Sequence, residues 1–394
     1  MKLGKLCILF TDGDWIESKD QSDSGIRLIQ TGNIGNGEFL YKNDKAKYIS
    51  VDTFKRLNCK EVFPNDILVS RLPEPVGRGC IIPDIGEKMI TAVDCTICRI
   101  NENLVDRKYF CYFLESNAYK TQLEQHVTGT TRKRISRKNL SSVEIDIPEQ
   151  AKQKEVVYKL DRLKKIIQNY NRELDLLDEL VRARFVEMFG RPTDKITRYP
   201  KVKIANLIKE GKASIKAGPF GSSLKKEFYV KKGFKIYGQE QVIKDDPTFG
   251  DYYINEERFN SLKSCEVHAG DILISLVGTC GKTMIMPENF EPGIINPRLL
   301  KITFDAEFII PIYFKYFFGS DDLQKTLNSA SGHSTMNVVN AGMLKNVELI
   351  MAPIELQNQF ASFVEEIDKS RSRIQKSLEA SQELFDSLMH EYFG

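Results

Sequence analysis

Two long stretches of the chain carry apolar residues at alternating spacings of three and four. The first runs from Glu149 to Phe189 and contains neither glycine nor proline. The second begins after Pro353 and continues to Gly394. An apolar stripe of period 3.5 sustained over several heptads is typical of a coiled-coil helix. We therefore predict two long helices with seam residues Leu160, Leu163, Ile167, Tyr170, Leu174, Leu177 and Val181, and Val364, Ile367, Ile374, Leu378, Phe385 and Leu388.

These stripes leave two interpretations open. Each helix could pack on its own globular part, or the two helices could cover each other as an antiparallel coiled coil. About 40 residues at a rise of about 1.5 Å each make a rod of roughly 60 Å, which is longer than a domain of about 150 residues is wide. The length therefore favours the coiled coil. Arg184, Arg371 and Ser381 interrupt the stripes, and such polar positions either set the register or mark frayed ends.

The chain repeats itself at a shift of roughly 200 residues, far longer than the about 20–50 residues of a solenoid unit. Asp66 recurs as Asp271, for example, and Leu160 recurs as Val364. We therefore expect a duplicated whole domain in the order globular part, helix, globular part, helix. The expected boundaries are 1–148, 149–192, 193–353 and 354–394.

Outside the two stripes, apolar residues fall into short runs bounded by turn residues, which is typical of strands. The runs at 66–71, 92–100 and 143–147 are examples. The segment Tyr109–Glu124 instead carries apolar residues at helical spacing, which predicts helical structure there. The expected fold class is α+β, with two tandem-duplicated α/β domains and two long helices.

Composition disfavours a membrane protein, a secreted protein and a cysteine-based metal or redox site. Hydrophobic residues make up 41% and charged residues 28% of the 394 residues, with a net charge of +3, as in an ordinary globular protein. No apolar run approaches the roughly 18 residues that span a bilayer, and the N-terminus lacks a signal-peptide core, so we expect a cytoplasmic protein. The Cys95/Cys98 pair lies in an expected strand, where residues three apart face opposite sides, which disfavours a metal or redox site.

We find no catalytic constellation and no metal site in the sequence. The segment 277–283 imitates a phosphate-binding loop, but Leu276 stands where the first glycine is required. The expected strand 284–286 follows, where a helix would be needed to hold phosphate. A nucleotide hydrolase built on Lys282 is therefore disfavoured. The four histidines are scattered, without a carboxylate or cysteine cluster around them.

Basic and hydroxyl residues gather in places that suit a polyanion. Residues 129–138 carry five positive charges, and Arg, Lys, Ser and Thr are the types that bind phosphates and base edges. The alternative is an ordinary solvated loop. The counterpart at 332–337 is polar but hardly charged, and basic residues lie at 216–232 instead. The candidate DNA-binding residues are Arg71, Arg78, Thr130, Thr131, Arg132, Lys133, Arg134, Arg137, Lys138, Lys216, Ser222, Ser223, Lys225, Lys226, Lys282, His333, Ser334 and Thr335.

Taken together, these features resemble the specificity subunits of type I restriction–modification systems. The resemblance covers essentially the whole chain. It rests on the strand motif repeated at 65–71 and 270–275, on the sequence Gly-Pro-Phe-Gly-Ser at 218–222, and on the passage from Pro148 through Glu149-Gln150 into a long helix. The second helix departs from the family pattern, because it opens with Ile-Glu-Leu-Gln at 354–357. No single motif is specific, but the ordered set is.

The resemblance implies target-recognition domains at 1–148 and 193–353, held apart by antiparallel helices at 149–192 and 354–394. Each domain would read one half of an asymmetric, bipartite target in double-stranded DNA. The chain itself would carry no chemistry. Two methyltransferase subunits would bring S-adenosylmethionine, and restriction/translocase subunits would bring ATP hydrolysis and Mg²⁺.

The dimensions agree with this interpretation. A rod of roughly 60 Å can place two readers on major grooves at least one helical turn, about 34 Å, apart. Inserting a heptad into 149–189 adds about 10.5 Å of rise and is expected to lengthen the spacer by about 3 base pairs; unchanged spacing in methylation mapping would contradict this. The rival interpretation, a coiled-coil protein-interaction scaffold, predicts no salt-dependent affinity for duplex DNA.

Overall fold

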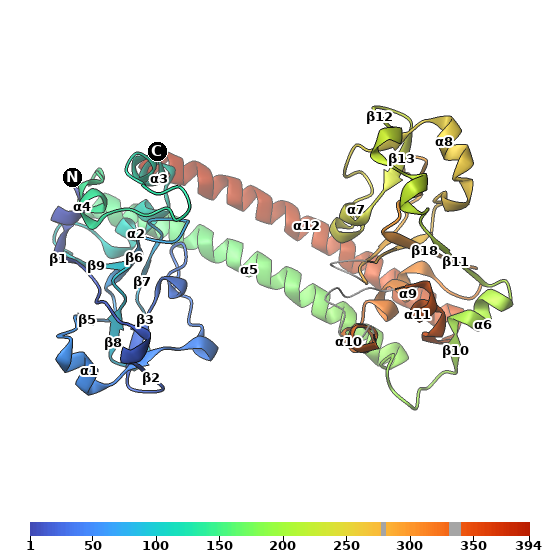
Figure 1. Ribbon diagram of the computed structural model, residues 1–394, viewed down its shortest axis with the longest axis horizontal. Coiled ribbons are helices and arrows are strands. Elements are labelled where there is room, and N and C mark those ends of the chain that lie inside the picture. The colour runs from blue at the N-terminus through green and yellow to red at the C-terminus, as the bar shows by residue number, and fades with distance from the viewer. Residues whose placement is uncertain (277–280, 331–339) are drawn as a thin grey trace. The chain divides into compact units, whose positions relative to one another are not determined.

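The computed structural model describes residues 1–276, 281–330 and 340–394 (Figure 1). It divides into unit 1, which comprises Met1–Asn171 and Lys376–Gly394, and unit 2, which comprises Arg172–Gln375. The two long helices, α5 (Gln150–Phe189) and α12 (Ile354–Phe393), each begin in one unit and end in the other. The prediction of two long helices is confirmed.

Unit 1 contains two sheets, and the more regular one is antiparallel throughout. Its strand order is β1 (Cys7–Asp12), β9 (Cys95–Ile100), β6 (Ile67–Ser70) and β7 (Gly79–Ile81). The second sheet has the order β2 (Gln21–Ser22), β4 (Tyr48–Ile49), β3 (Ile26–Ile29), β8 (Met89–Thr91) and β5 (Glu61–Val62). The shorter helices are α1 (Val51–Arg56), α2 (Arg107–Glu115), α3 (Asn117–Glu124) and α4 (Arg137–Ser142).

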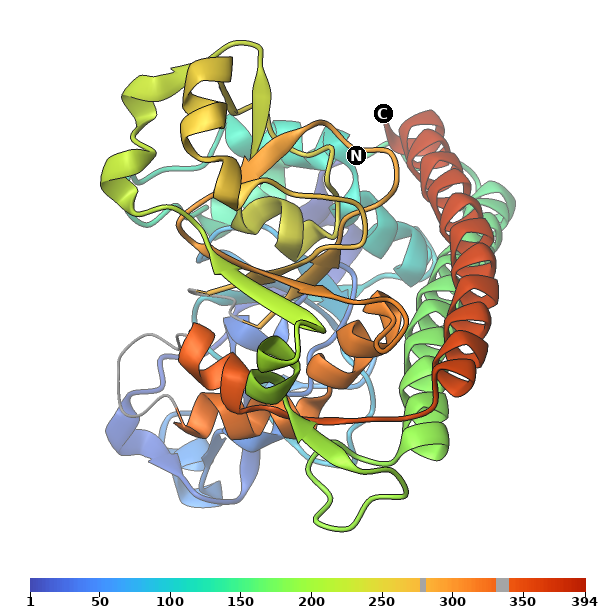
Figure 2. The same cartoon turned by 90° about the vertical axis from the view of Figure 1, so that its right-hand side faces the viewer.

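Unit 2 repeats this plan, and Figure 2 turns it toward the viewer. Its antiparallel sheet has the order β11 (Ala213–Ala217), β18 (Leu299–Phe304), β15 (Ile272–Ser275) and β16 (Thr283–Ile285). A second sheet contains β12 (Tyr229–Val230), β14 (Tyr253–Ile254), β13 (Phe234–Tyr237) and β17 (Gly293–Ile295), and β10 (Lys201–Lys203) pairs with β19 (Glu348–Ile350). Its helices are α6 (Ile204–Lys209), α7 (Gln239–Lys244), α8 (Glu256–Ser261), α9 (Pro311–Phe318), α10 (Asp321–Ala330) and α11 (Ala341–Asn346).

The two antiparallel sheets correspond strand by strand. Ser70 of β6 lies opposite Cys95 of β9, and Ser275 of β15 lies opposite Leu299 of β18. In both units the central strands are buried on both faces, which explains why they are continuous apolar runs in the sequence. The predicted α+β class is confirmed.

The cysteine pair lies in β9, as predicted from the sequence. Cys95 packs in one apolar cluster with Leu68 and Ile97, whereas Cys98 packs in another with Ile67 and Val69. The two thiols therefore face opposite sides of the sheet. Among the residues described, no group of His, Cys, Asp and Glu side chains is placed to hold a metal ion.

One element prediction is confirmed only in part, and another is wrong. The segment Tyr109–Glu124 is helical as expected but forms two helices, because buried Ser116 adopts an extended conformation and caps α3 by accepting a hydrogen bond from the amide of Tyr119. The strand expected at 143–147 forms only one isolated bridge, between Glu144 and Lys2. The partner segment turns into a 3-10 helix at Leu3–Leu6, so the ladder ends there.

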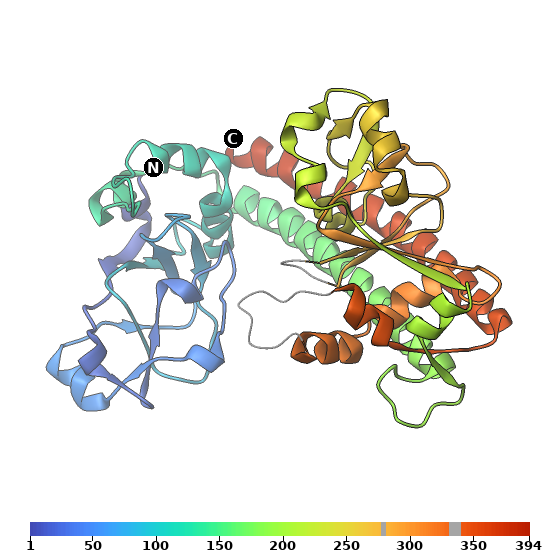
Figure 3. The same cartoon turned by 45° about the vertical axis from the view of Figure 1, so that its right-hand side comes forward.

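The ends of α5 and α12 pack together within each unit. In unit 1, Val156 and Leu160 share an apolar cluster with Met389 and Phe393, so the end of α12 lies beside α2 and α3 (Figure 3). In unit 2, the rings of Phe185 and Phe360 have centroids 5.4 Å apart. In both units the start of one helix therefore lies beside the end of the other.

The predicted seam residues are all buried or half-buried, whereas most of their helical neighbours are exposed. The apolar stripe is thus the face of each long helix that is least exposed to solvent. Pairing along the full length of the helices stays a proposal. No helix in the described part of the chain is long and apolar enough to cross a membrane.

Candidate nucleic-acid interface

The basic segment, defined as residues 129–138, forms a projecting loop on unit 1. Backbone hydrogen bonds of 2.9 Å run in both directions between Thr128 and Arg134 and close the loop. Thr130, Thr131, Arg132, Lys133 and Arg134 are all exposed on it. Ile135 follows and is buried, which anchors the loop to the body of the unit. The segment therefore presents several cations and hydroxyls at one place on the surface.

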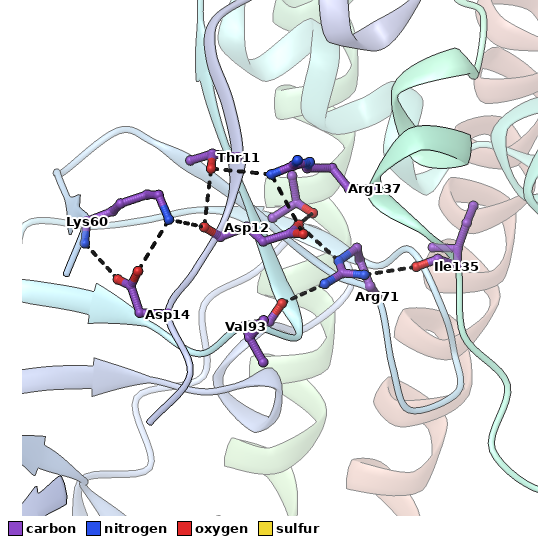
Figure 4. Close-up of polar contacts among 9 residues, drawn as sticks. Thr11, Asp12, Asp14, Lys60, Arg71, Val93, Ile135 and Arg137 are labelled. Carbon is purple, nitrogen blue, oxygen red and sulfur yellow. Dashed lines mark hydrogen bonds and ion pairs between the residues drawn. The ribbon is translucent and has the colours of Figure 1, made fainter. Parts of the chain in front are cut away.

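Arg71 holds this loop in place (Figure 4). Its guanidinium donates to the carbonyl of Ile135 at 3.2 Å and to the carbonyl of Val93 at 2.6 Å. The amide of Ile135 in turn donates to the carbonyl of Arg71 at 3.2 Å. The side chain of Arg71 is only 14% exposed. Arg71 was predicted to bind DNA, but in the structure its guanidinium contacts the protein's own backbone and a carboxylate.

That carboxylate belongs to Asp12, at the end of β1, and it lies between two arginines (Figure 4). One oxygen lies 3.2 Å from Nε of Arg71 and accepts a hydrogen bond of 3.0 Å from Thr96. The other lies 3.8 Å from the guanidinium of Arg137, which also donates to Thr11 at 3.5 Å. Asp12 thus links the strand edge to the start of α4, and the exposed Arg137 keeps donors that face solvent.

Arg78 is also engaged within the protein. Its guanidinium donates to four backbone carbonyls, those of Thr31, Ile34, Pro73 and Pro75, at 2.7 to 3.0 Å. Burial lowers the pKa of this guanidinium from its usual value, although an arginine remains charged at any physiological pH. Arg78 ties two loops of unit 1 together, and its predicted role in DNA binding stays a prediction.

A basic hollow adjoins the loop and includes two residues, Lys2 and Lys5, that were not predicted from the sequence to bind DNA. It has a volume of about 770 Å³ and is lined by Lys2, Lys5, Arg137 and Lys138 around Asp12. All four cations are exposed. The sequence signal was the pair of lysines at the N-terminus, but only the fold brings them beside the basic segment. Excess positive charge in a concave surface attracts a polyanion.

In unit 2 the residues predicted to bind DNA lie in two separate segments. Lys216 is at the end of β11, and Ser222, Ser223, Lys225 and Lys226 follow on the segment that leaves that strand. Lys225 is exposed and lies 3.6 Å from Glu227.

Lys282 is exposed on the β15–β16 loop. It is followed by β16, so the predicted strand is confirmed where a phosphate-binding loop would need a helix. His333, Ser334 and Thr335, and residues 277–280 of the loop, lie outside the described residues.

Comparison with known proteins gives a consistent result. Residues 1–178 and 209–382 match the family described as type I restriction modification DNA specificity domain. The specificity subunit of the type I restriction enzyme EcoBI of Escherichia coli is 22% identical over 322 residues, covering 75% of this chain and 67% of that protein. The EcoKI specificity subunit of Escherichia coli strain K12 is 20% identical over 386 residues, covering 90% and 78%.

Solved structures show the same fold. A chain from a study of complex assembly and conformational transition of the type I R-M system aligns with a TM-score of 0.62 at 13% identity, covering 100% of this chain and 96% of that one. The S subunit of a type I restriction–modification system from M. genitalium aligns with a TM-score of 0.54 at 14% identity, covering 100% and 95%. The resemblance inferred from the sequence is confirmed, and the chain belongs to the type I restriction modification DNA specificity domain family.

Proposed function

We propose that this chain is the DNA-reading specificity subunit of a type I restriction–modification complex. Each unit reads one half of an asymmetric, bipartite target in double-stranded DNA, and the chain itself is not catalytic. The observation that carries the proposal is the basic segment of unit 1, which Arg71 clamps and which lies beside a hollow lined by four cations. Family membership supports the same function.

The asymmetry of the target follows from the different surfaces of the two units. Unit 1 exposes Arg132, Lys133 and Arg134 on one loop, whereas unit 2 exposes Lys225 and Lys226 on the segment after β11. Side chains that differ in type and placement contact different base edges. Two similar scaffolds with different surfaces therefore suit one site with two unlike halves.

The long helices set the spacer between the half-sites and provide docking surfaces in this proposal. Full-length antiparallel pairing of α5 with α12 would bury the seam residues, which are already shielded within each unit. Two methyltransferase subunits would dock on the outer faces and bring S-adenosylmethionine. Restriction/translocase subunits would bring ATP and Mg²⁺.

Methylation mapping tests the proposal directly. A host carrying the chain with its methyltransferase subunits is sequenced by a single-molecule method that detects methylated adenine. We expect one bipartite motif. The variant Arg132→Ala/Lys133→Ala/Arg134→Ala should weaken or alter one half-site, and Lys225→Ala/Lys226→Ala should affect the other.

The salt dependence of binding to the mapped duplex measures how much phosphate contacts contribute to the affinity. Log affinity falls with log salt, and each lost phosphate contact makes this negative slope shallower by about 0.9. The slope of the triple variant should therefore be shallower than that of the wild type by up to about 2.7. Lys154→Ala/Lys165→Ala, which removes exposed cations of α5, serves as the control and keeps the slope. A chain without salt-dependent duplex affinity would contradict the proposal and indicate a protein-interaction scaffold.

A further inference from the structure

Two aromatic side chains stand exposed at equivalent positions of the two units. Trp15 follows β1 and is 70% exposed, and Phe220 follows β11 and is 87% exposed. The preceding glycines confirm the equivalence: the amide of Gly13 donates to the carbonyl of Cys95 at 2.9 Å, and that of Gly218 donates to the carbonyl of Leu299 at 3.0 Å. These acceptors occupy matching places in β9 and β18.

The backbone before each aromatic residue is closely packed. A Cβ at Gly13 would lie 2.3 Å from the carbonyl oxygen of Thr91, and one at Gly218 would lie 1.8 Å from that of Asn296. Only glycine allows this approach, so the turn is held against the neighbouring strand end in both units. Each ring is thus presented from a fixed backbone, which lowers the entropic cost of using it in binding.

The carboxylates near Trp15 are paired with cations. Glu17 lies 2.6 Å from Lys19, and Asp14 lies 3.3 Å from Lys60. Asp12 faces Arg71 and Arg137, as described above. These pairs reduce the repulsion that a phosphate backbone would otherwise meet at this edge of the sheet.

The surroundings of Phe220 are glycine, serine and lysine. Gly221 and Ser222 follow it directly, and Lys225 and Lys226 lie on the same segment, both exposed. The core of a protein–protein interface instead gathers apolar side chains and is depleted in charge. A lone ring among cations and small polar residues suits stacking on a nucleic-acid base.

We propose that Trp15 and Phe220 are a matched pair of DNA contacts, one in each unit, that stack on a base of the target duplex. This inference rests on the proposed function and deepens it. Within a duplex the faces of the bases are covered by their neighbours, so each ring must enter at a base step that is kinked or unstacked in the complex. Every base has a π face, so a ring stacked there contributes affinity with little sequence preference. A contact of that kind can be kept in both copies of a duplicated domain while the surfaces that distinguish sequences diverge. The retained position of the two rings and the different basic residues fit this division.

The chain offers a direct reporter, because Trp15 is its only tryptophan. The full-length chain is titrated with a duplex carrying the mapped target, and tryptophan emission is recorded. We expect quenching that saturates with binding. Addition of methyltransferase subunits without DNA should leave the emission unchanged. The double variant Trp15→Phe/Phe220→Trp moves the reporter to unit 2 and should give the same quenching.

Affinity measurements complete the test. Trp15→Ala and Phe220→Ala should each weaken binding of the mapped duplex roughly 5- to 150-fold, the range for loss of one base–aromatic stack, whereas Trp15→Phe retains most of the affinity. Because both side chains are exposed, the melting temperature should not change. The exposed apolar residues Tyr158 and Ile196 provide alanine controls that keep the affinity.

The outcomes separate the two proposals. If a target is mapped but the alanine variants bind it as tightly as the wild type, the stacking inference is overturned and the proposed function stands. Quenching by methyltransferase subunits alone would equally overturn it and identify the rings as a protein-docking site. If no target is mapped, both proposals fall.

Discussion

The two units keep the same carboxylate in their antiparallel sheets but neutralise it differently. In unit 1, Asp66 accepts two hydrogen bonds of 2.8 Å from the guanidinium of Arg99. In unit 2, Asp271 lies 2.9 Å from Lys301 and accepts a hydrogen bond of 2.5 Å from Thr303. Both carboxylates are almost fully buried.

The strand registers show that Arg99 and Lys301 occupy different positions on equivalent strands. Ile67 lies opposite Cys98 and Ile272 lies opposite Ile302, so Arg99 is equivalent to Thr303. The cation of unit 2, Lys301, therefore lies two residues earlier on its strand, on the same face of the sheet. The duplication has preserved the need for a cation beside the buried carboxylate without preserving the residue that supplies it.

A second pair, Gln153 and Gln357, has the same residue type and the same pattern of hydrogen bonds in both units. Each is fully buried near the start of its long helix. Gln153 accepts from the amide of Asp106 and donates to the carbonyls of Leu104 and Pro148. Gln357 accepts from the amide of Ile310 and donates to those of Phe308 and Ala352. The scaffold contacts of the two units are therefore retained, whereas their exposed basic residues differ.

Removing the buried carboxylate should have the largest effect and should differ between the units. Asp271→Ala leaves Lys301, whose side chain is only 10% exposed, without its paired carboxylate, although its hydrogen bond to the carbonyl of Glu266 remains. We expect a loss of about 3–5 kcal/mol in the free energy of unfolding. Asp66→Ala should cost less, because Arg99 is 28% exposed and can be solvated. Urea unfolding measures both. The exposed Asp23→Ala is the control, and equal losses for Asp66→Ala and Asp271→Ala would contradict the expected difference between the units.

Removing the buried amide should have a smaller effect that is the same in both units. Gln153→Ala and Gln357→Ala each leave a partly buried backbone amide without its acceptor, which costs about 1–3 kcal/mol. Urea midpoints of the two variants should therefore fall by similar amounts. Gln150→Ala, which removes a hydrogen bond to the carbonyl of Glu102 at an exposed position, should fall less. A difference of more than about 1 kcal/mol between the two buried sites would show that the units are not equivalent here.

The smallest expected effects are on the pH dependence of stability, and they have opposite signs in the two units. In unit 1, burial raises the pKa of Glu115 above its ordinary value of 4.5, although Lys164 acts in the other direction. The folded state therefore binds the proton more tightly, and stability falls as pH rises through the raised pKa. In unit 2, the hydrogen bond from Lys235 lowers the pKa of Glu291 below 4.5, so its contribution is present above 4.5 and is lost as pH falls through the lowered pKa.

Glutamine variants isolate these two effects. Relative to the wild type, Glu115→Gln should gain stability as pH rises above 4.5, whereas the deficit of Glu291→Gln should shrink as pH falls below 4.5. Urea midpoints between neutral pH and about pH 3 measure both differences, because the loss at Glu291 lies below pH 4.5. The effect at Glu291 should be weak, because its side chain is half-exposed and solvent screens the interaction. Parallel slopes for the two variants would contradict the opposite signs.

Local patterns predicted some features well and others poorly. The period of 3.5 predicted α5 and α12 and the shielding of their apolar stripes, because that signal is repeated over many turns. The break at Ser116 was missed, because helical spacing continues across it and one serine can either extend a helix or cap the next one. The strand expected at 143–147 was wrong because its length depends on how far the partner strand continues.

At the candidate site, too, the sequence predicted some features and only the tertiary structure decided others. Composition and spacing were enough to locate the basic segment, since clustered charge is written along the chain. The sequence could not show that Arg71 and Arg78 contact the protein's own backbone. Their acceptors include Ile135 and Thr31, which are 64 and 47 residues away. A guanidinium carries the same charge whether it faces solvent or a buried carbonyl, so only folding, which brings distant carbonyls within hydrogen-bonding distance, distinguishes a clamp from a free cation.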